Sequence, residues 1–369
     1  MTAGGLHVDA RLRRGSFTLE VAAEIPAGHT LGIIGPNGAG KTSLLRAVAG
    51  LTALDAGLIA FGTTPWDQPD AGVFVDPTRR RCPILFQDYR LFPHLSVLDN
   101  VAYPHRVTGT RRRQARDRAR ATLELFGLAD LHELAPRQLS GGQAQRVAMA
   151  RALTTDPHVL LLDEPLAALD ARTRQATRAE LKAMLGRFTG PAVLVTHDPL
   201  EAMTLADHLL VLEAGRVVQH GTPHDLAARP ATDYVARLVG VNLYTGTMTA
   251  DGIITLPEGG SLHVAIDNDT AARVGEPALV ALSPTAISVH RNRPESLSAQ
   301  NVWPAVIRGV EPLRDRIRLE LHGQPSALVD ITPRALTDLA LDIGDAVWLS
   351  AKATEAHAYT AQPAGPPTV

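Results

Sequence analysis

A glycine-rich run, Gly35-Pro36-Asn37-Gly38-Ala39-Gly40-Lys41-Thr42, constrains the fold of this chain more than any other feature. It follows the apolar stretch Leu31–Ile34, which is predicted to be a strand, and it opens a segment with helical spacing. This order matches G-x-x-x-x-G-K-[ST], a strand-to-helix loop whose backbone N–H groups turn inward around phosphates. We therefore expect a nucleotide site in which Lys41 reaches the β- and γ-phosphates and Thr42 ligates Mg²⁺. The alternative is a glycine-rich turn with a surface lysine.

Length and composition narrow the class of protein. The 369 residues exceed a typical single domain, and 45% hydrophobic with 20% charged residues is typical of ordered globular chains. A formal net charge of -2 supplies no bulk attraction for nucleic acid, so no nucleic-acid partner is expected. The single cysteine, Cys82, excludes an intrachain disulfide and fits a reducing compartment. We find no apolar run long enough to cross a bilayer and no signal-peptide pattern, which favours a cytoplasmic location.

The first two thirds of the chain alternate short apolar runs with amphipathic stretches, as expected for an α/β domain with a buried parallel sheet. We place this domain at residues 1–240. Strand signals vanish between about 88 and 138, where a helical subdomain is expected, with Arg111–Leu131 predicted to be helical. The basic run Arg111–Arg120 has Asp117 and Glu124 nearby and no interleaved aromatic residue, so a solvated helix face is favoured over a nucleic-acid or lipid surface.

Residues 241–369 have a different sequence pattern, in which short β-rich runs are broken by Gly, Pro, Asn and Asp. This pattern predicts a separate all-β domain of small barrels of the OB type. Its two stretches, Asn242–His290 and Ser298–Tyr359, are similar in length and are read as two related barrels.

Two adjacent carboxylates, Asp163 and Glu164, end the apolar run Val159–Leu162. Neighbouring side chains on a strand point to different sides, so the two acids can have different roles. Asp163 is expected to act at the Mg²⁺, and Glu164 to polarise the attacking water. Taken alone, the same run would be read as a strand that ends in a solvated acidic turn.

A second anion site is predicted at Ser140-Gly141-Gly142-Gln143, which precedes a strongly periodic helix. One chain has one γ-phosphate to bind, so two phosphate loops are redundant unless each nucleotide is shared with another chain. Ser140 as an ordinary helix N-cap is compatible with this reading.

With these motifs in this order, the chain resembles ABC-type ATPases, which have a P-loop NTPase fold and act as dimers. The resemblance implies ATP and Mg²⁺ as cofactors, with Ser43 completing the phosphate loop and the signature Ser140–Gln143 closing on the partner's ATP. It implies catalytic roles for Glu164, for the switch histidine His197 and for Gln87, which senses the metal. The residues implied at the metal are Thr42, Gln87 and Asp163. Asp170 would link the two sites across the homodimer. Alone, Gln87, Asp170 and His197 would be read as a surface residue, an N-cap and a structural histidine.

The base site departs from the family pattern. The family often stacks adenine on an aromatic residue upstream of the phosphate loop, but Leu12 or Arg13 stands near that place here. Phe17 is expected to be core, which leaves an arginine stack open.

The segment Phe86–His94, together with Pro77–Arg81, resembles import ATPases for molybdate and, less closely, those for sulfate, polyamines and ferric ion. That resemblance implies two transmembrane permease subunits, a periplasmic or extracellular substrate-binding protein, and a peripheral place on the cytoplasmic face of the membrane. Two alternatives come from other classes: a soluble non-transport ABC ATPase, and an oxyanion-sensing or storage protein that relies on the C-terminal barrels alone.

Residues 298–360 resemble the small oxyanion-binding (TOBE/Mop-like) barrel attached to molybdate import ATPases. The donors implied for molybdate or tungstate are Ser298, Asn301, Thr332 and Lys352, which supply hydroxyl, amide and ammonium groups. The alternative is that they are ordinary turn and strand-end residues of a structural barrel.

Overall fold

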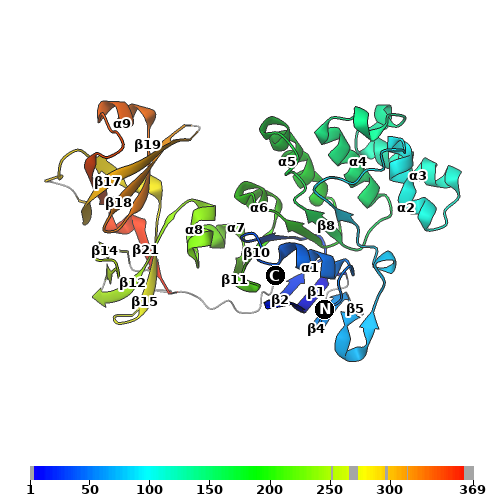
Figure 1. Ribbon diagram of the computed structural model, residues 1–369, viewed down its shortest axis with the longest axis horizontal. Helices are drawn as coiled ribbons and strands as arrows, with labels where there is room; N and C mark the ends of the chain where they lie inside the picture. Colours follow the sequence, from blue (N-terminus) through cyan, green and yellow to red (C-terminus); the bar gives the residue numbers. More distant parts are fainter. Residues whose placement is uncertain (1–3, 251, 266–272, 296–297, 314, 361–369) are drawn as a thin grey trace. The chain divides into compact units, whose positions relative to one another are not determined.

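The computed structural model describes residues 4–250, 252–265, 273–295, 298–313 and 315–360. The chain forms two compact units, the first ending at Pro223 and the second beginning at His224 (Figure 1). This division falls before the boundary expected near residue 240. Helices α7 (Pro223–Ala228) and α8 (Asp233–Val239) lead into the second unit. The Tyr359 hydroxyl donates to the Pro230 carbonyl at 2.8 Å, which ties the segment between these helices to that unit.

A large mixed sheet forms the frame of the first unit. Its strands in chain order are β1 (Leu6–Arg14), β2 (Phe17–Ile25), β3 (Thr30–Ile34), β4 (Ala56–Phe61), β5 (Thr64–Gln68), β6 (Val73–Phe74), β7 (Ile84–Leu85), β8 (Leu160–Asp163), β9 (Ala192–Val195), β10 (His208–Glu213) and β11 (Arg216–Gly221). Within the described residues they are arranged as β6-β5-β4-β1-β2-β11-β10-β3-β9-β8-β7.

The parallel part of this sheet runs from β10 through β3, β9 and β8 to β7. Every residue of β3 and β9 is buried, as expected for strands covered on both faces. The helices packed with the sheet are α1 (Lys41–Val48), α5 (Ala171–Leu185) and α6 (Pro199–Leu205). The predicted α/β class is confirmed.

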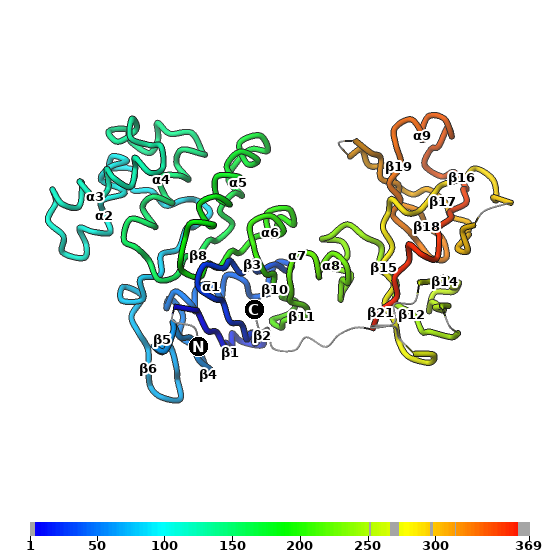
Figure 2. Tube along the Cα trace, turned by 180° about the vertical axis from the view of Figure 1, so that it is seen from behind, coloured from blue at the N-terminus to red at the C-terminus, as the bar shows by residue number. Residues whose placement is uncertain are grey.

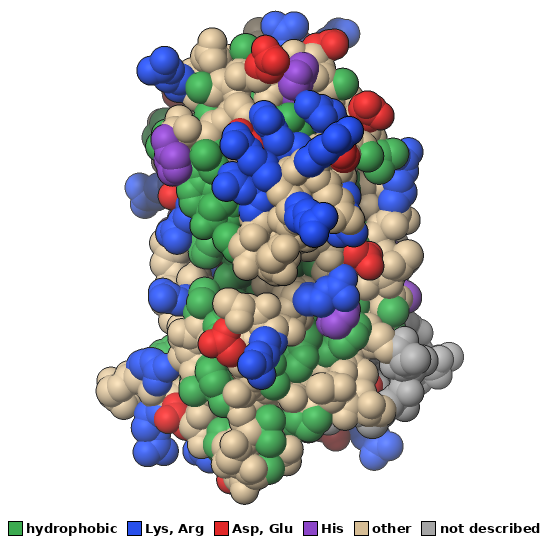
Figure 3. All heavy atoms as spheres, turned by 90° about the vertical axis from the view of Figure 1, so that its right-hand side faces the viewer, with side chains coloured by type: hydrophobic (Ala, Val, Ile, Leu, Met, Phe, Trp, Pro, Cys, Tyr) green, Lys and Arg blue, Asp and Glu red, His purple; other side chains and the backbone are tan. Residues whose placement is uncertain are grey.

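Helices α2 (Val97–Val107), α3 (Arg112–Leu125) and α4 (Gly141–Leu153) form a subdomain with its own apolar core. On α3 the buried residues Ala115, Ala119 and Leu123 recur at intervals of four and face this core. Basic side chains gather on the outer face of the subdomain (Figure 3). No described helix is long and apolar enough to span a membrane.

The second unit consists of two antiparallel sheets. Its elements are β12 (Asn242–Ala250), β13 (Ile253–Thr255), β14 (Ser261–His263), β15 (Pro277–Leu282), β16 (Ser288–His290), β17 (Asn301–Pro312), β18 (Ile317–Gly323), β19 (Ala327–Ile331), α9 (Pro333–Asp338), β20 (Ala346–Ala351) and β21 (Ala356–Tyr359). The described strands pair as β14-β13-β12-β15-β21 and β16-β20-β17-β18-β19. The predicted all-β, OB-like character of this unit is confirmed.

These sheets differ from the expected pair of consecutive barrels because the halves exchange edge strands. Strand β16 precedes Ser298 but pairs with β20, whereas β21 comes from the chain end and pairs with β15 (Figure 2). One hydrophobic cluster includes residues of both sheets, from Tyr244 to Ala358. Residue periodicity identifies strands but not their partners, so the sequence could not reveal this exchange.

Candidate active site

Four parallel strands of the first unit end at one edge of the sheet. The register pairs Ile33 with Val195, Asp163 with Val195, and Leu85 with Leu162. The segments that follow these strands contain Gly35, Gln87, Glu164 and His197. The fold therefore brings separate motifs of the chain to the edge where α/β proteins bind ligands.

The phosphate loop depends on glycine at two close approaches. Gly35 has φ 156°, and a Cβ there would lie 2.1 Å from the Leu212 carbonyl oxygen. Gly40, with φ 107°, precedes α1, and a Cβ there would lie 2.7 Å from the Leu19 side chain. A side chain at either position would displace the loop from β2 or β10.

The Lys41 ammonium lies within this loop and donates to the carbonyls of Gly35 at 2.7 Å and Pro36 at 3.0 Å. Burial lowers the pKa of Lys41, while the nearby carboxylates of Glu164 and Asp163 act in the opposite direction. The lysine is thus a nearly buried cation within the field of the acidic pair, at the position where a phosphate would replace its carbonyl partners.

The acidic pair stands where β8 ends. Burial is the main cause that raises the pKa of Asp163, and the charge of Glu164 adds to it. Lys41 and Arg90 oppose this shift. Glu164 has left-handed backbone geometry, with φ 48°, and its N–H donates to the Val195 carbonyl at 2.8 Å. The turn of β8 is therefore fixed to the end of β9.

This connection continues through the side chains. Oε1 of Glu164 lies 3.1 Å from Nδ1 of His197, and the carboxylate is 26% exposed against 61% for the imidazole. A water molecule could enter from solvent and bind beside Glu164, where His197 would be its neighbour. The arrangement suits general-base polarisation of water.

The residues expected at the metal supply chemically suitable oxygen atoms. Thr42, on the first turn of α1, offers a hydroxyl, Gln87 an amide and Asp163 a carboxylate. Mg²⁺ prefers such hard oxygen ligands, together with water and phosphate. The charge of Glu164 adds to the raised pKa of the Asp163 carboxyl, and a divalent cation nearby would offset that repulsion. The residues present therefore fit the ion.

The signature motif begins α4. The Ser140 hydroxyl accepts from the Gln143 N–H at 3.3 Å, and the Gln143 side chain accepts from the Ser140 N–H at 2.9 Å. This capping box pre-forms the helix start, and Ser140 and Gly141 are exposed. Gly142 lies in the same turn and is half-buried. Asp170 caps α5 in a similar way, accepting from the N–H groups of Arg172 and Thr173.

A hollow of about 200 Å³ lies beside α1. Its lining consists of Leu12, Arg14, Phe17, Leu19, Ser43, Arg46 and Thr52. Strand alternation places Arg14, rather than Arg13, on the hollow's side of β1. The Phe17 ring packs against Gly40 of the phosphate loop, so closely that a Cβ added to Gly40 would lie 3.2 Å from the ring. Phe17 therefore supports the loop by packing.

The four expected oxyanion donors are not gathered within one chain. Asn301 pairs with Ala351, next to Lys352, at one end of β17, whereas Thr332 follows β19 near the Pro312 end. The Asn301 amide is occupied by both backbone groups of His263, and the Thr332 hydroxyl caps α9. Ser298 and Lys352 are exposed.

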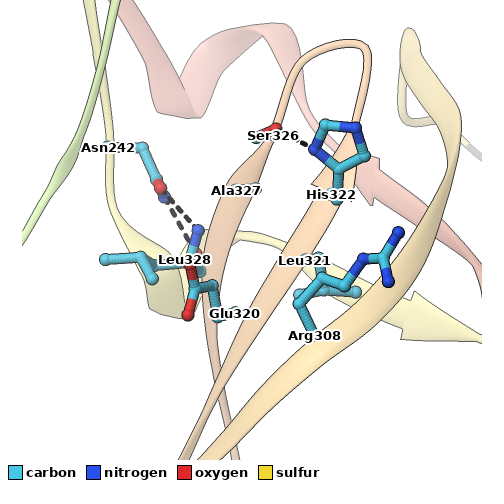
Figure 4. Close-up of a pocket in the computed structure, with 8 residues that line it drawn as sticks. All are labelled: Asn242, Arg308, Glu320, Leu321, His322, Ser326, Ala327 and Leu328. Atoms are coloured by element: carbon cyan, nitrogen blue, oxygen red, sulfur yellow. Dashed lines mark hydrogen bonds between the residues drawn. The ribbon is translucent and has the colours of Figure 1, made fainter. Parts of the chain in front are cut away.

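A separate hollow of about 360 Å³ opens in the second unit (Figure 4). Arg308, Glu320 and His322 line it, and the Ser326 hydroxyl lies 3.3 Å from Nδ1 of His322. The Asn242 amide bridges to the backbone of Leu328 at its rim, with bonds of 2.7 and 2.9 Å. Asn242 therefore joins β12 of one sheet to β19 of the other.

Sequence reasoning missed two arginines that support the site. Arg80 is fully buried and donates to the carbonyls of Ala47 and Val48 at the end of α1, and to those of Trp66 and Val75. Arg151, on α4, donates to the loop after Gln87. Arg80 stands in the run Arg79-Arg80-Arg81, which is typical of an exposed surface, and Arg151 is a single arginine near the end of an apolar helix. Neither position identifies the carbonyls that the side chain binds.

Comparisons with known proteins agree with this geometry. The ABC transporter family matches residues 19–167, and the TOBE domain matches residues 297–358. The molybdenum import ATP-binding protein ModC of Mycobacterium tuberculosis is 38% identical over 351 residues, covering 93% of this chain and 94% of the relative.

Import proteins named for other substrates are nearly as similar. The sn-glycerol-3-phosphate import ATP-binding protein UgpC of Chromohalobacter salexigens is 37% identical over 90% of this chain and 81% of its own length. The trehalose/maltose import ATP-binding protein MalK of Thermococcus litoralis is 39% identical over 65% of each chain.

Proposed function

Because this chain belongs to the ABC transporter family of ATP-binding proteins, we propose that it is the ATP-hydrolysing subunit that energises an importer. The three relatives described above are named import ATP-binding proteins. The observation that carries the proposal is the meeting of the phosphate loop, the acidic pair, Gln87 and His197 at one sheet edge.

In the proposed reaction, the loop amides and Lys41 hold the ATP phosphates. Lys41 exchanges its two carbonyl partners for phosphate oxygens, which keeps its buried charge compensated. Glu164 accepts a proton from the attacking water, and His197 holds the γ-phosphate side of the site at 3.1 Å from that carboxylate. Thr42, Gln87 and Asp163 would hold Mg²⁺, which would supply positive charge against the phosphates.

The base of ATP would occupy the hollow beside α1, between Leu12 and Ser43. The Arg14 guanidinium offers a planar cation to the ring in place of an aromatic side chain.

The functional unit would be a homodimer. The signature turn at Ser140 and Gly141 is exposed and pre-formed, and a second phosphate loop is useful only when another chain supplies the nucleotide. Asp170, which caps α5, would stand at the same boundary.

Molybdate is the proposed cargo. The ModC relative matches across both units, and residues 297–358 match the TOBE domain. UgpC also matches most of the chain, so sn-glycerol-3-phosphate is a competing cargo. The resemblance carried by Phe86–His94 adds sulfate, ferric ion and polyamines as further candidates. The chain would act at the cytoplasmic face of the membrane, bound to two permease subunits. An external binding protein would deliver the cargo to them.

Reconstitution tests both the importer role and the identity of the cargo. The chain is co-expressed with its permease subunits in vesicles, and ATP hydrolysis is measured with molybdate, tungstate, sulfate or sn-glycerol-3-phosphate and the external binding protein. Stimulation by molybdate and tungstate alone is expected. Stimulation by another cargo reassigns the substrate, and ATPase activity with no permease partner would favour a soluble, non-transport role.

We also propose that the second unit senses oxyanion. Ser298 and Lys352 are exposed donors at one end of the second sheet, and a dianion site there needs groups from a second copy. Calorimetry of the full chain with molybdate, against Lys352→Ala, tests it. If the full chain does not bind molybdate, the sensing proposal fails, and the second unit would instead serve only for dimerisation.

A further inference from the structure

The segment Phe86–Phe92, called here the glutamine loop, has an unfavourable backbone. Tyr89 and Arg90 are consecutive non-glycine residues with φ 55° and 43°. This left-handed geometry is rare for residues with bulky side chains and persists only where the surroundings hold it. Something outside the loop must therefore fix it.

Arg151 provides this fixation. Its Nη1 donates to the Arg90 carbonyl at 2.7 Å, and its Nη2 donates to the Tyr89 carbonyl at 2.8 Å. The guanidinium also lies over the Phe92 ring, 5.5 Å from its centroid. One rigid fork thus binds both left-handed residues, which a lysine ammonium cannot do with the same geometry.

The other side of the loop frames Gln87. The Arg90 guanidinium lies over the Phe86 ring at 4.0 Å, and its Nε donates to Asp88 at 3.2 Å. Arg90 therefore contacts both chain neighbours of Gln87. We expect a shift of the Arg90 backbone to disturb these contacts on either side of the glutamine.

Arg151 stands in the last turn of α4, whose first turn is the signature motif. The Tyr89 side chain is buried in the same apolar cluster as Ala148 and Met149 of that helix. The glutamine loop is therefore attached to the signature helix by a polar fork and an apolar anchor.

We propose that Arg151 is a positioning residue that holds Gln87 in register with the metal site. This inference rests on the proposed ATPase function.

The first test replaces Arg151 by lysine in the full chain. Binding of a non-hydrolysable ATP analogue is measured by calorimetry over a range of Mg²⁺ concentrations. We expect the Mg²⁺ needed for half-maximal binding to rise on the order of tenfold, as for loss of an outer partner of a metal ligand. Analogue affinity without Mg²⁺, which depends on the phosphate loop, stays unchanged.

Arg146→Lys is the matched control. Arg146 stands on the same helix but pairs with Glu180 of α5 at 3.6 Å and does not bind the glutamine loop. Its Mg²⁺ requirement is expected to match the wild type. Equal shifts in both variants would mean general loosening of α4 and would overturn the proposal.

A double-mutant cycle distinguishes positioning from a merely structural role. In a Gln87→Ala background, Arg151→Lys should cause no further change in Mg²⁺ requirement, because its effect passes through Gln87. Additive shifts would overturn the proposal. A lower melting temperature with an unchanged Mg²⁺ requirement would do the same.

If Arg151→Lys fails to fold, Phe92→Leu removes the ring beneath the guanidinium and keeps every hydrogen bond of the fork. It should shift the Mg²⁺ requirement in the same direction, and no shift counts against the proposal. Absence of ATP hydrolysis in the wild type would instead count against the proposed function.

Discussion

Oε1 of Glu164 lies 3.1 Å from Nδ1 of His197, across the ends of two neighbouring parallel strands. Because β8 and β9 are paired in register up to Asp163 and Val195, the sheet brings the backbones of these two residues to one edge. The carboxylate is less exposed than the imidazole, so the histidine is the solvent-facing member of the pair. The chemistry expected at Glu164 follows from this placement.

Glu164→Gln should retain ATP binding and lose hydrolysis. The amide keeps the size of the side chain but cannot accept a proton, and loss of a general base costs about 10² to 10⁴ in rate. Steady-state ATPase assays and gel filtration with ATP measure the effect, and a closed dimer should accumulate. Rapid turnover by the variant would remove Glu164 from its proposed role.

Lys41→Ala should abolish measurable ATP binding. The ammonium is nearly buried and is the cation that the loop directs toward the phosphates. Lys182→Ala is the control, since Lys182 stands half-exposed on α5. Fluorescent-nucleotide titration compares the two, and unchanged affinity in Lys41→Ala would contradict the phosphate-loop assignment.

Arg80→Leu should destabilise the first unit by about 3 kcal/mol, because the buried carbonyls of Ala47, Val48 and Trp66 each lose a hydrogen bond from a charged donor. Chemical denaturation measures this change. Arg79→Leu removes an exposed arginine next to it in sequence and should have little effect. Equal losses in both variants would argue against the buried fork.

Glu201→Gln should change how stability depends on pH. Glu201 is buried on α6, and burial raises the pKa of its carboxyl; Asp198 adds to this, while the Thr196 hydroxyl and the arginines 174 and 178 oppose it. A raised native pKa contributes stability below the unfolded value of about 4.5 that is lost as pH rises through the native value.

The unfolding free energy of the wild type should therefore fall relative to Glu201→Gln as pH rises above about 4.5, by at most about 1.4 kcal/mol per pH unit. Urea denaturation of both proteins at a series of pH values measures the difference. Parallel stability curves would show that this carboxyl does not titrate differently in the folded state.

The sequence by itself determined the nucleotide chemistry and the fold class. The phosphate loop, the acidic pair and the signature are local motifs, and each sets its own backbone: glycines at Gly35 and Gly40, a strand end at Asp163, a capping box at Ser140. Local motifs can be read along the chain because their geometry depends on neighbours in sequence. Their order was enough to indicate the family.

Only the tertiary structure decided which distant residues hold these motifs in place. Arg80 and Arg151 form their bonds with carbonyls far away in the sequence, and β16 and β21 pair outside their own halves of the second unit. The same folding separates Thr332 from Asn301. Such contacts depend on packing between elements, and an arginine or a short strand carries no local mark of the partner that will bury it.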